Sequence, residues 1–230
     1  MNKLKTNCKP LDNLLNGGLE SGIITTIYGP AGSGKSNIAI IAAANISKTG
    51  NIIFVDTESS MSLERYKQIS GNEKLKNIEL IEPAEFEDQK KAIRSLRELV
   101  KEKEIKLIII DSLTMLYRLE LSQKPEEINF ELTKQLSILS SIARRKNIPI
   151  LVTNQVYADF EKRDNIKMVG GDILKYWSKC IIRLDKKESV RKATLIKHRS
   201  LPENRFFFFK ITNEGLEEIN EIDKKINVFN

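Results

Sequence analysis

The sequence predicts an α/β protein whose mostly parallel, twisted sheet is flanked by helices and gains antiparallel strands at its C-terminal edge. Up to Asn154, short apolar runs alternate with longer segments that carry apolar residues at helical spacing, as in a parallel sheet wound by right-handed crossovers. From Lys179 onward, apolar runs follow one another with only short charged or proline-containing turns between them, which favours hairpins.

The first half of the chain supplies the parallel strands. Residues 51–56 and 107–111 are continuous apolar runs that end in an aspartate, as expected of strands covered on both faces. Ser62 can cap a helix that runs to about Ser70, and Pro83 introduces a long, solvent-facing helix. Further strands are predicted at 23–28, 78–81, 148–154, 180–184, 193–197 and 205–212, and further helices at 37–47 and 130–146.

Length and composition fit one globular domain. The chain has 230 residues, of which 40% are hydrophobic and 30% charged, and no apolar run approaches the roughly 20 residues that span a bilayer. We expect a single domain over residues 1–220, a loose tail over 221–230 and a cytoplasmic location with Cys8 and Cys180 as free thiols. The net charge of +7 fits a polyanionic partner, although solvated surface lysines explain it equally well.

A glycine-rich segment between the first parallel strand and its helix carries the strongest functional signal. It matches the phosphate-binding pattern G-x-x-x-x-G-K-[ST] at every fixed position, and it follows a strand and precedes a helix as that pattern requires. Lys35 would reach the terminal phosphates of a nucleotide, and the Ser36 hydroxyl would hold Mg²⁺. The predicted nucleotide contacts are Gly29, Pro30, Ala31, Gly32, Ser33, Gly34, Lys35, Ser36 and Asn37.

Three other strand ends offer groups that turnover of a nucleotide would need. Asp111 has the position of a carboxylate that holds the Mg²⁺ shell, or of a helix cap. Glu58 and Asp56 compete equally, from the residues alone, for the orientation of an attacking water. Gln155 ends a third strand and presents an amide able to sense a γ-phosphate, or one satisfied by neighbouring backbone.

These residues occur together and in the order found in the RecA/RadA recombinase family, which the chain resembles over almost its whole length. Within that family it is most similar to the short archaeal paralogues of RadA. The resemblance implies a RecA-like ATPase core that binds ATP and Mg²⁺, with Glu58 rather than Asp56 as catalytic glutamate, Asp111 at the metal and Gln155 as γ-phosphate sensor. It rests on the phosphate loop and on Leu11–Gly18, Val55–Glu58, Ile110–Thr114, Val152–Val156, Gly170–Gly171 and Ile211–Leu216.

In such proteins two loops face DNA, and they map to about residues 117–130 and 157–171. The first keeps Arg118 but carries Glu126 and Glu127, where phosphates would have to approach. The second offers cations for a phosphate backbone and little for reading bases. We therefore expect weak, salt-sensitive and sequence-independent binding of single-stranded DNA, or else loops that are merely solvated. The candidate DNA contacts are Arg118, Lys162, Arg163 and Lys167.

The chain also lacks part of the family pattern for self-assembly into filaments. No N-terminal helix-hairpin-helix domain is expected, and none of the phenylalanines is followed by alanine three residues later, as a RadA-type docking motif requires. Lys197 and Arg199 have the K-x-R spacing of fingers that some RecA-like ATPases insert into a neighbour's ATP site. Charges that protect an edge strand from aggregation explain the same two residues equally well.

These features favour a recombination accessory protein, in which weak ATP hydrolysis drives a switch and the partners are a RadA-type recombinase and single-stranded DNA. Two alternatives stay open. One is a self-sufficient DNA-dependent recombinase, and the other is a KaiC-like regulatory ATPase that forms a homo-oligomer through its ATP sites and acts on proteins. Membrane partners are not expected.

Overall fold

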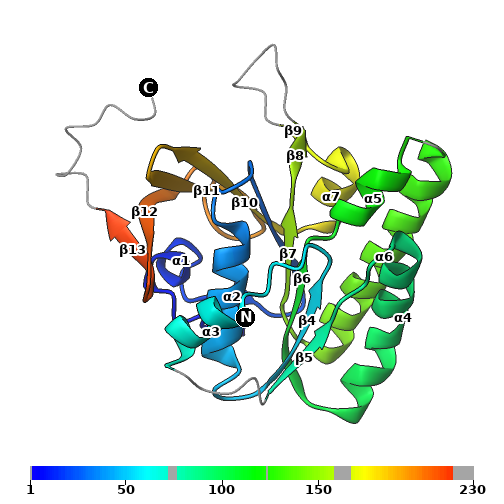
Figure 1. Cartoon of the computed structure of the whole chain (residues 1–230), viewed down its shortest axis with the longest axis horizontal. Helices are drawn as coiled ribbons and strands as arrows, with labels where there is room; N and C mark the ends of the chain where they lie inside the picture. The colour runs from blue at the N-terminus through cyan, green and yellow to red at the C-terminus, as the bar shows by residue number, and fades with distance from the viewer. Residues whose placement is uncertain (1, 72–76, 123, 158–166, 220–230) are drawn as a thin grey trace.

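The computed structural model describes residues 2–71, 77–122, 124–157 and 167–219 (Figure 1). A nine-stranded sheet runs through it in the order β13-β12-β11-β10-β3-β7-β6-β4-β5. The α/β prediction is confirmed, since the strands from β10 to β5 pair in parallel and β11, β12 and β13 are added antiparallel at the C-terminal edge.

The parallel strands end at one edge of the sheet, where the polar residues of interest follow them. They are β3 (Ile24–Tyr28), β4 (Asn51–Asp56), β5 (Ile78–Ile81), β6 (Ile105–Asp111), β7 (Ile150–Asn154) and β10 (Cys180–Lys187). The antiparallel strands are β11 (Val190–His198), β12 (Phe206–Thr212) and β13 (Gly215–Ile219). Two short pairs lie outside this sheet: β1 (Lys3–Leu4) with β2 (Leu19–Glu20), and β8 (Val156–Tyr157) with β9 (Lys167–Met168).

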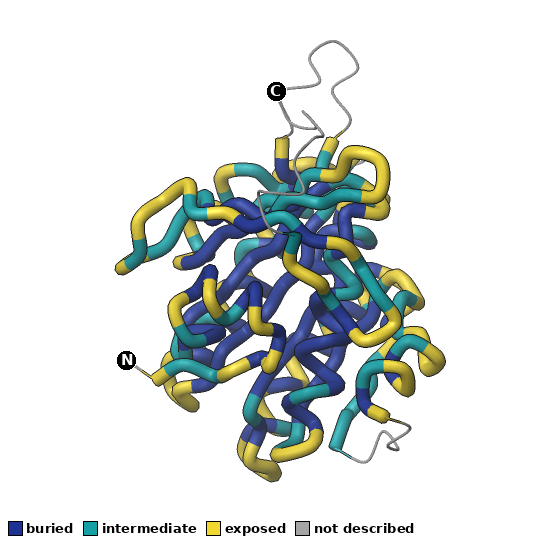
Figure 2. Tube along the Cα trace, turned by 90° about the vertical axis from the view of Figure 1, so that its left-hand side faces the viewer, coloured by how far each residue is buried: buried dark blue, intermediate teal, exposed yellow. Residues whose placement is uncertain are grey.

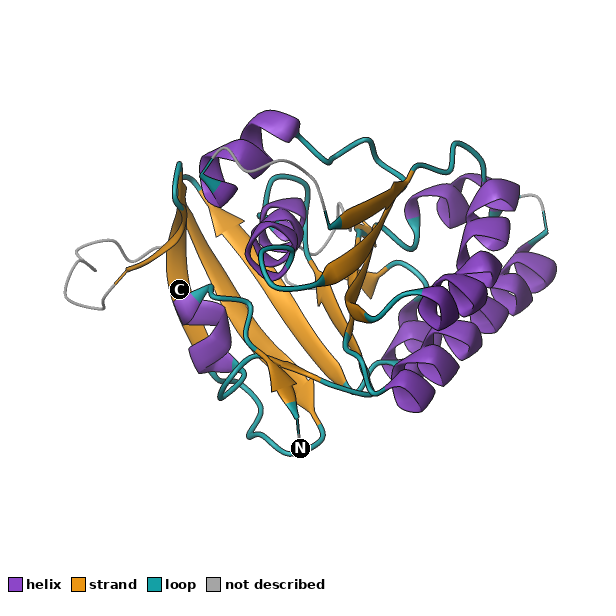
Figure 3. Cartoon of the chain, turned by 90° about the horizontal axis from the view of Figure 1, so that it is seen from below, coloured by secondary structure: helices purple, strands orange, loops and turns teal. Residues whose placement is uncertain are grey.

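Helices cover both faces of the sheet. One face packs against α1 (Lys9–Leu14) and α2 (Lys35–Ile46), with α3 (Leu63–Ser70) against α2. The other packs against α4 (Phe86–Glu102), α5 (Met115–Glu120), α6 (Pro125–Lys146) and α7 (Gly171–Trp177). Figure 3 shows the long helices of this second layer gathered on one side of the strands.

Two hydrophobic cores follow from the alternation of side chains along the central strands. In β6, Ile108 and Ile110 point into the core beneath α4 and α6, whereas Leu107 and Ile109 point into the core beneath α2. All four are fully buried, which explains why this strand is a continuous apolar run rather than an alternating one. Figure 2 shows the buried trace in the middle of the molecule and the exposed trace at its turns.

The structure corrects several predicted boundaries. The segment 117–130, expected as a loop, is largely helical: α5 extends to Glu120 and α6 starts at Pro125. Proline at the first position of a helix is a start signal that the prediction passed over. The strand β13 and the helix α7 were not predicted. Of the other expectations, the tail at 221–230 and most of the second loop, at 158–166, lie outside the described residues.

Within the described ranges, no helix is both long and apolar enough to cross a membrane.

Candidate functional site

The phosphate loop and the three polar strand ends meet at one edge of the sheet. The registers place Tyr28 beside Asn154 and Asp56 beside Asp111, so the residues that follow β3, β4, β6 and β7 emerge next to one another. A cavity of about 550 Å³ opens there, and Gly29, Lys35, Ser36, Glu58 and Gln155 all line it.

Two glycines give the loop a shape that other residues would not allow. At Gly29 a Cβ atom would lie 2.4 Å from the carbonyl oxygen of Leu184 on β10, so the close approach of the two backbones requires glycine. Gly34 precedes α2 with φ of +103°, in the left-handed region that side chains rarely adopt. The loop therefore turns directly into α2, whose free N–H groups and positive dipole end favour phosphate oxygens.

Lys35 folds back over this loop. Its Nζ donates to the carbonyl oxygens of Gly29 and Pro30, at 2.9 and 3.0 Å. Burial lowers the pKa of Lys35, and the nearby carboxylates of Glu58 and Asp111 oppose that shift. The ammonium group thus sits in the cavity between the loop and two carboxylates, where a phosphate could accept its hydrogen bonds.

Asp111 is buried at the end of β6, with 1% of its surface exposed. Burial raises the pKa of its carboxyl group, while hydroxyl groups that donate to the carboxylate lower it: those of Ser60, Thr153 and Ser36. Ser36 and Asp111 are therefore adjacent. A hydroxyl and a carboxylate are oxygen ligands of the kind that Mg²⁺ takes beside a nucleotide, so these two residues fit the predicted metal site.

The two acids that competed for water activation are in different environments. Asp56 is buried, and its carboxylate accepts hydrogen bonds from the backbone N–H groups of Glu58, Ser60 and Met61 at 2.8–3.1 Å. Asp56 therefore shapes the segment after β4. Glu58 is exposed and lines the cavity, so its carboxylate can reach a ligand there.

Glu58 and Gln155 contact each other directly. The Gln155 amide donates to Glu58 Oε1 at 2.8 Å, and the Ser112 hydroxyl donates to the same oxygen. The ends of β4, β6 and β7 are thus linked by side chains over the phosphate loop. Sequence reasoning assigned Glu58 and Gln155 separate roles and gave no indication of this contact.

Three cationic side chains on the cavity wall were not predicted from the sequence to contact a nucleotide. Arg118, predicted as a DNA contact, lies on α5 and lines this cavity. Lys186 and Arg191 face each other across the β10–β11 hairpin, and Arg191 Nε donates to the carbonyl oxygen of Gly32 at 3.3 Å. Their position depends on the pairing of β10 with β3, for which the sequence contains no local signal.

The other predicted site residues lie elsewhere. Lys197 and Arg199 are at the opposite end of the sheet, because His198 pairs with Cys180 at the start of β10. Lys197 donates to the carbonyl oxygen of Lys175, and Arg199 forms an ion pair with buried Glu20. They could reach only a neighbouring chain's ATP site. Of the predicted DNA contacts, Lys167 is exposed on β9, and Lys162 and Arg163 lie outside the described residues.

Comparison with known proteins gives a consistent result. The Rad51 family model matches residues 1–219. A DNA repair and recombination protein RadB from Methanococcus maripaludis is 46% identical over 218 residues, 92% of this chain and 98% of the relative. The RadB proteins of Methanobrevibacter smithii and Archaeoglobus fulgidus are 41% and 38% identical, over 93% of this chain and 95% and 97% of theirs. A solved structure described as the RadB recombinase matches with a TM-score of 0.81 and 36% identity, covering 94% of this chain and all of that one.

The structural role of Asp56 and the ligand-facing role of Glu58 can be tested by measuring the free energy of unfolding of variants. The two oxygens of the Asp56 carboxylate share three backbone N–H donors, and Asn replaces one of these oxygens with an N–H donor. At least one backbone N–H group then loses its acceptor, so we expect the free energy of unfolding to fall by about 1–3 kcal/mol. The matched variant Glu58→Gln, at an exposed position, should change it by less than about 0.5 kcal/mol. Urea unfolding followed by circular dichroism measures both. Equal losses in the two variants would contradict the assignment.

Proposed function

Because the chain belongs to the Rad51 family, we propose that it is an ATP-binding accessory protein of DNA repair and recombination, which hydrolyses ATP slowly with Mg²⁺ and assists a RadA-type recombinase. The names of its relatives support the biological setting. The hydrogen bond between Glu58 and Gln155 above the phosphate loop is the observation that carries the proposed chemistry.

Each residue of the site then has a defined task. Lys35 would exchange the two loop carbonyl oxygens for terminal phosphate oxygens, and Ser36 and Asp111 would hold Mg²⁺. The nucleotide would supply the phosphoryl group, and the metal would neutralise part of its charge. Glu58 orients a water and accepts its proton at a carboxylate oxygen, with the Ser112 hydroxyl holding that carboxylate in place.

Gln155 gives the site a way to report its occupancy. Its amide donates to Glu58 and, more weakly, to the Met115 sulfur. A γ-phosphate oxygen would compete with Glu58 for this amide. Gln155 is followed directly by β8, which pairs with β9. The second of the two loops expected to face DNA connects these two strands. A change of partner at Gln155 would therefore act on that loop, which makes ATP the ligand of a switch.

Two sequence features favour an accessory role over a recombinase that forms its own filament on DNA. The segment 117–130 holds acids near the surface where DNA phosphates would approach. No phenylalanine of the chain is followed by alanine at the third position. Weak, sequence-independent contact with single-stranded DNA would then fall to the second loop, to which Lys167 belongs.

Glu58→Gln tests the assigned chemistry. The variant keeps the size of the side chain and the acceptor for Ser112 but cannot take a proton. We expect its affinity for ATP to stay within about twofold and its turnover to fall at least 10²-fold, the lower end of the effect of general bases. Equilibrium binding and steady-state phosphate release measure the two quantities. Unchanged turnover would show that another group activates the water.

The accessory role is tested by asking which macromolecule the ATP-loaded protein binds. We expect purified RadA to be retained by the immobilised chain in an amount that differs between ATP, ADP and no nucleotide. A fluorescent oligo-dT should bind weakly and lose affinity steeply as salt rises. Absence of RadA in all three states would reject the accessory role. Joint molecules formed by the chain alone with ATP and Mg²⁺ would favour a self-sufficient recombinase instead.

A further inference from the structure

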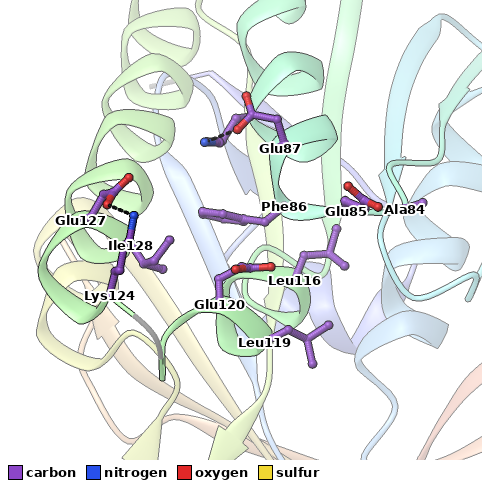
Figure 4. A pocket seen from close by; sticks show the side chains of 11 residues that line it. Ala84, Glu85, Phe86, Glu87, Leu116, Leu119, Glu120, Lys124, Glu127 and Ile128 are labelled. Carbon is purple, nitrogen blue, oxygen red and sulfur yellow. Dashed lines mark ion pairs between the residues drawn. The ribbon is translucent and has the colours of Figure 1, made fainter.

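A second cavity lies away from the nucleotide site, between the N-terminal ends of α4 and α6 and the side of α5. We call it the α4–α6 groove; its volume is about 520 Å³ (Figure 4). Its apolar lining comes from Phe86, Leu116, Leu119 and Ile128. Phe86 and Leu116 are buried and form the floor, whereas Leu119 is 58% exposed on the wall. Leu119 thus extends the apolar floor to a surface that another molecule can reach.

The rim of the groove is acidic although the chain as a whole carries a net charge of +7. Its two lysines are already paired with nearby glutamates. Lys90 pairs with Glu87 on α4, and Lys124, which precedes α6, pairs with Glu127 at 3.3 Å (Figure 4). Two further carboxylates, those of Glu85 and Glu120, line the groove and form no ion pair or hydrogen bond within the described residues.

Among the described residues, neither of these two carboxylates has a hydrogen-bond partner on its own helix. Glu85 precedes α4 at the N-cap position, yet its side chain caps no backbone N–H group. Glu120 is the last residue of α5, at the end of a helix where exposed carbonyl groups disfavour a carboxylate. By contrast, Glu87 and Glu127 each form an ion pair with a lysine. Glu85 and Glu120 are thus left free to bind a cation from outside.

We propose that the α4–α6 groove binds a protein segment in which one large apolar side chain is flanked by lysine or arginine. The apolar side chain would lie on Phe86 and Leu116 beside Leu119, and the flanking cations would pair with Glu85 and Glu120. DNA is a poor occupant, because the carboxylates repel phosphates. The family resemblance assigned the segment 117–130 to DNA. Part of this segment lines the groove and is thus a protein-binding surface. This inference does not depend on ATP binding or turnover.

Selection of peptides from a random display library on the purified full-length chain tests the proposal. We expect the recovered peptides to share one large apolar residue close to at least two lysines or arginines. Their affinity, from fluorescence anisotropy, should fall at least tenfold for Glu120→Lys and for Leu119→Ser. The matched control Glu102→Lys makes the same charge change at the exposed far end of α4 and should keep the affinity within twofold.

Several results would overturn the proposal. The selection could recover no peptide. The recovered peptides could bind the wild type and Glu120→Lys equally, or oligo-dT could displace them. A mass by light scattering that falls from dimer to monomer in Glu120→Lys would instead make a second copy of the chain the occupant. Thermal melting confirms that the variants fold, and ATP binding by the same samples separates this outcome from a failure of the nucleotide site.

Discussion

The parallel pairing of β3, β7, β6 and β4 is the interaction on which the rest of the structure depends. Parallel neighbours end at the same edge of the sheet, so groups distant in the sequence emerge side by side. Because each strand is buried on both faces, a shift in register would expose apolar residues and is strongly disfavoured. The position of Glu58 relative to Gln155 is therefore fixed by the packing of residues that never touch a ligand.

The same edge concentrates buried polar groups whose desolvation must be compensated. Asp111 is surrounded by three donating hydroxyl groups, and Asp56 by backbone N–H groups. An unpaired carboxylate buried at either position would cost several kcal/mol. The site is thus held in shape by bonds among its own residues, and Lys35, Glu58 and Gln155 are the side chains that can exchange their present partners for a ligand.

Local patterns in the sequence were sufficient for the fold class and for placing the candidate site residues at the ends of parallel strands, whereas the choice of Glu58 over Asp56 needed the family resemblance. Apolar runs located β4 and β5 to the residue, and the Ser62 cap located α3. What failed depends on distant contacts. No local signal shows that β10 lies beside β3, so the approach of Lys186 and Arg191 to the phosphate loop could not be foreseen. Similarly, Arg118 was assigned to a loop because the short helix α5 has too few residues to show periodicity.

Calorimetric titration of Mg-ATP into the purified chain tests the central claim, that the strand ends form one nucleotide site around Lys35. The account predicts one saturable site per chain. Since a charge-assisted hydrogen bond contributes about 1.5–3 kcal/mol, affinity should fall at least about tenfold in Lys35→Ala. The absence of saturable binding, or equal affinity in Lys35→Ala, would contradict it.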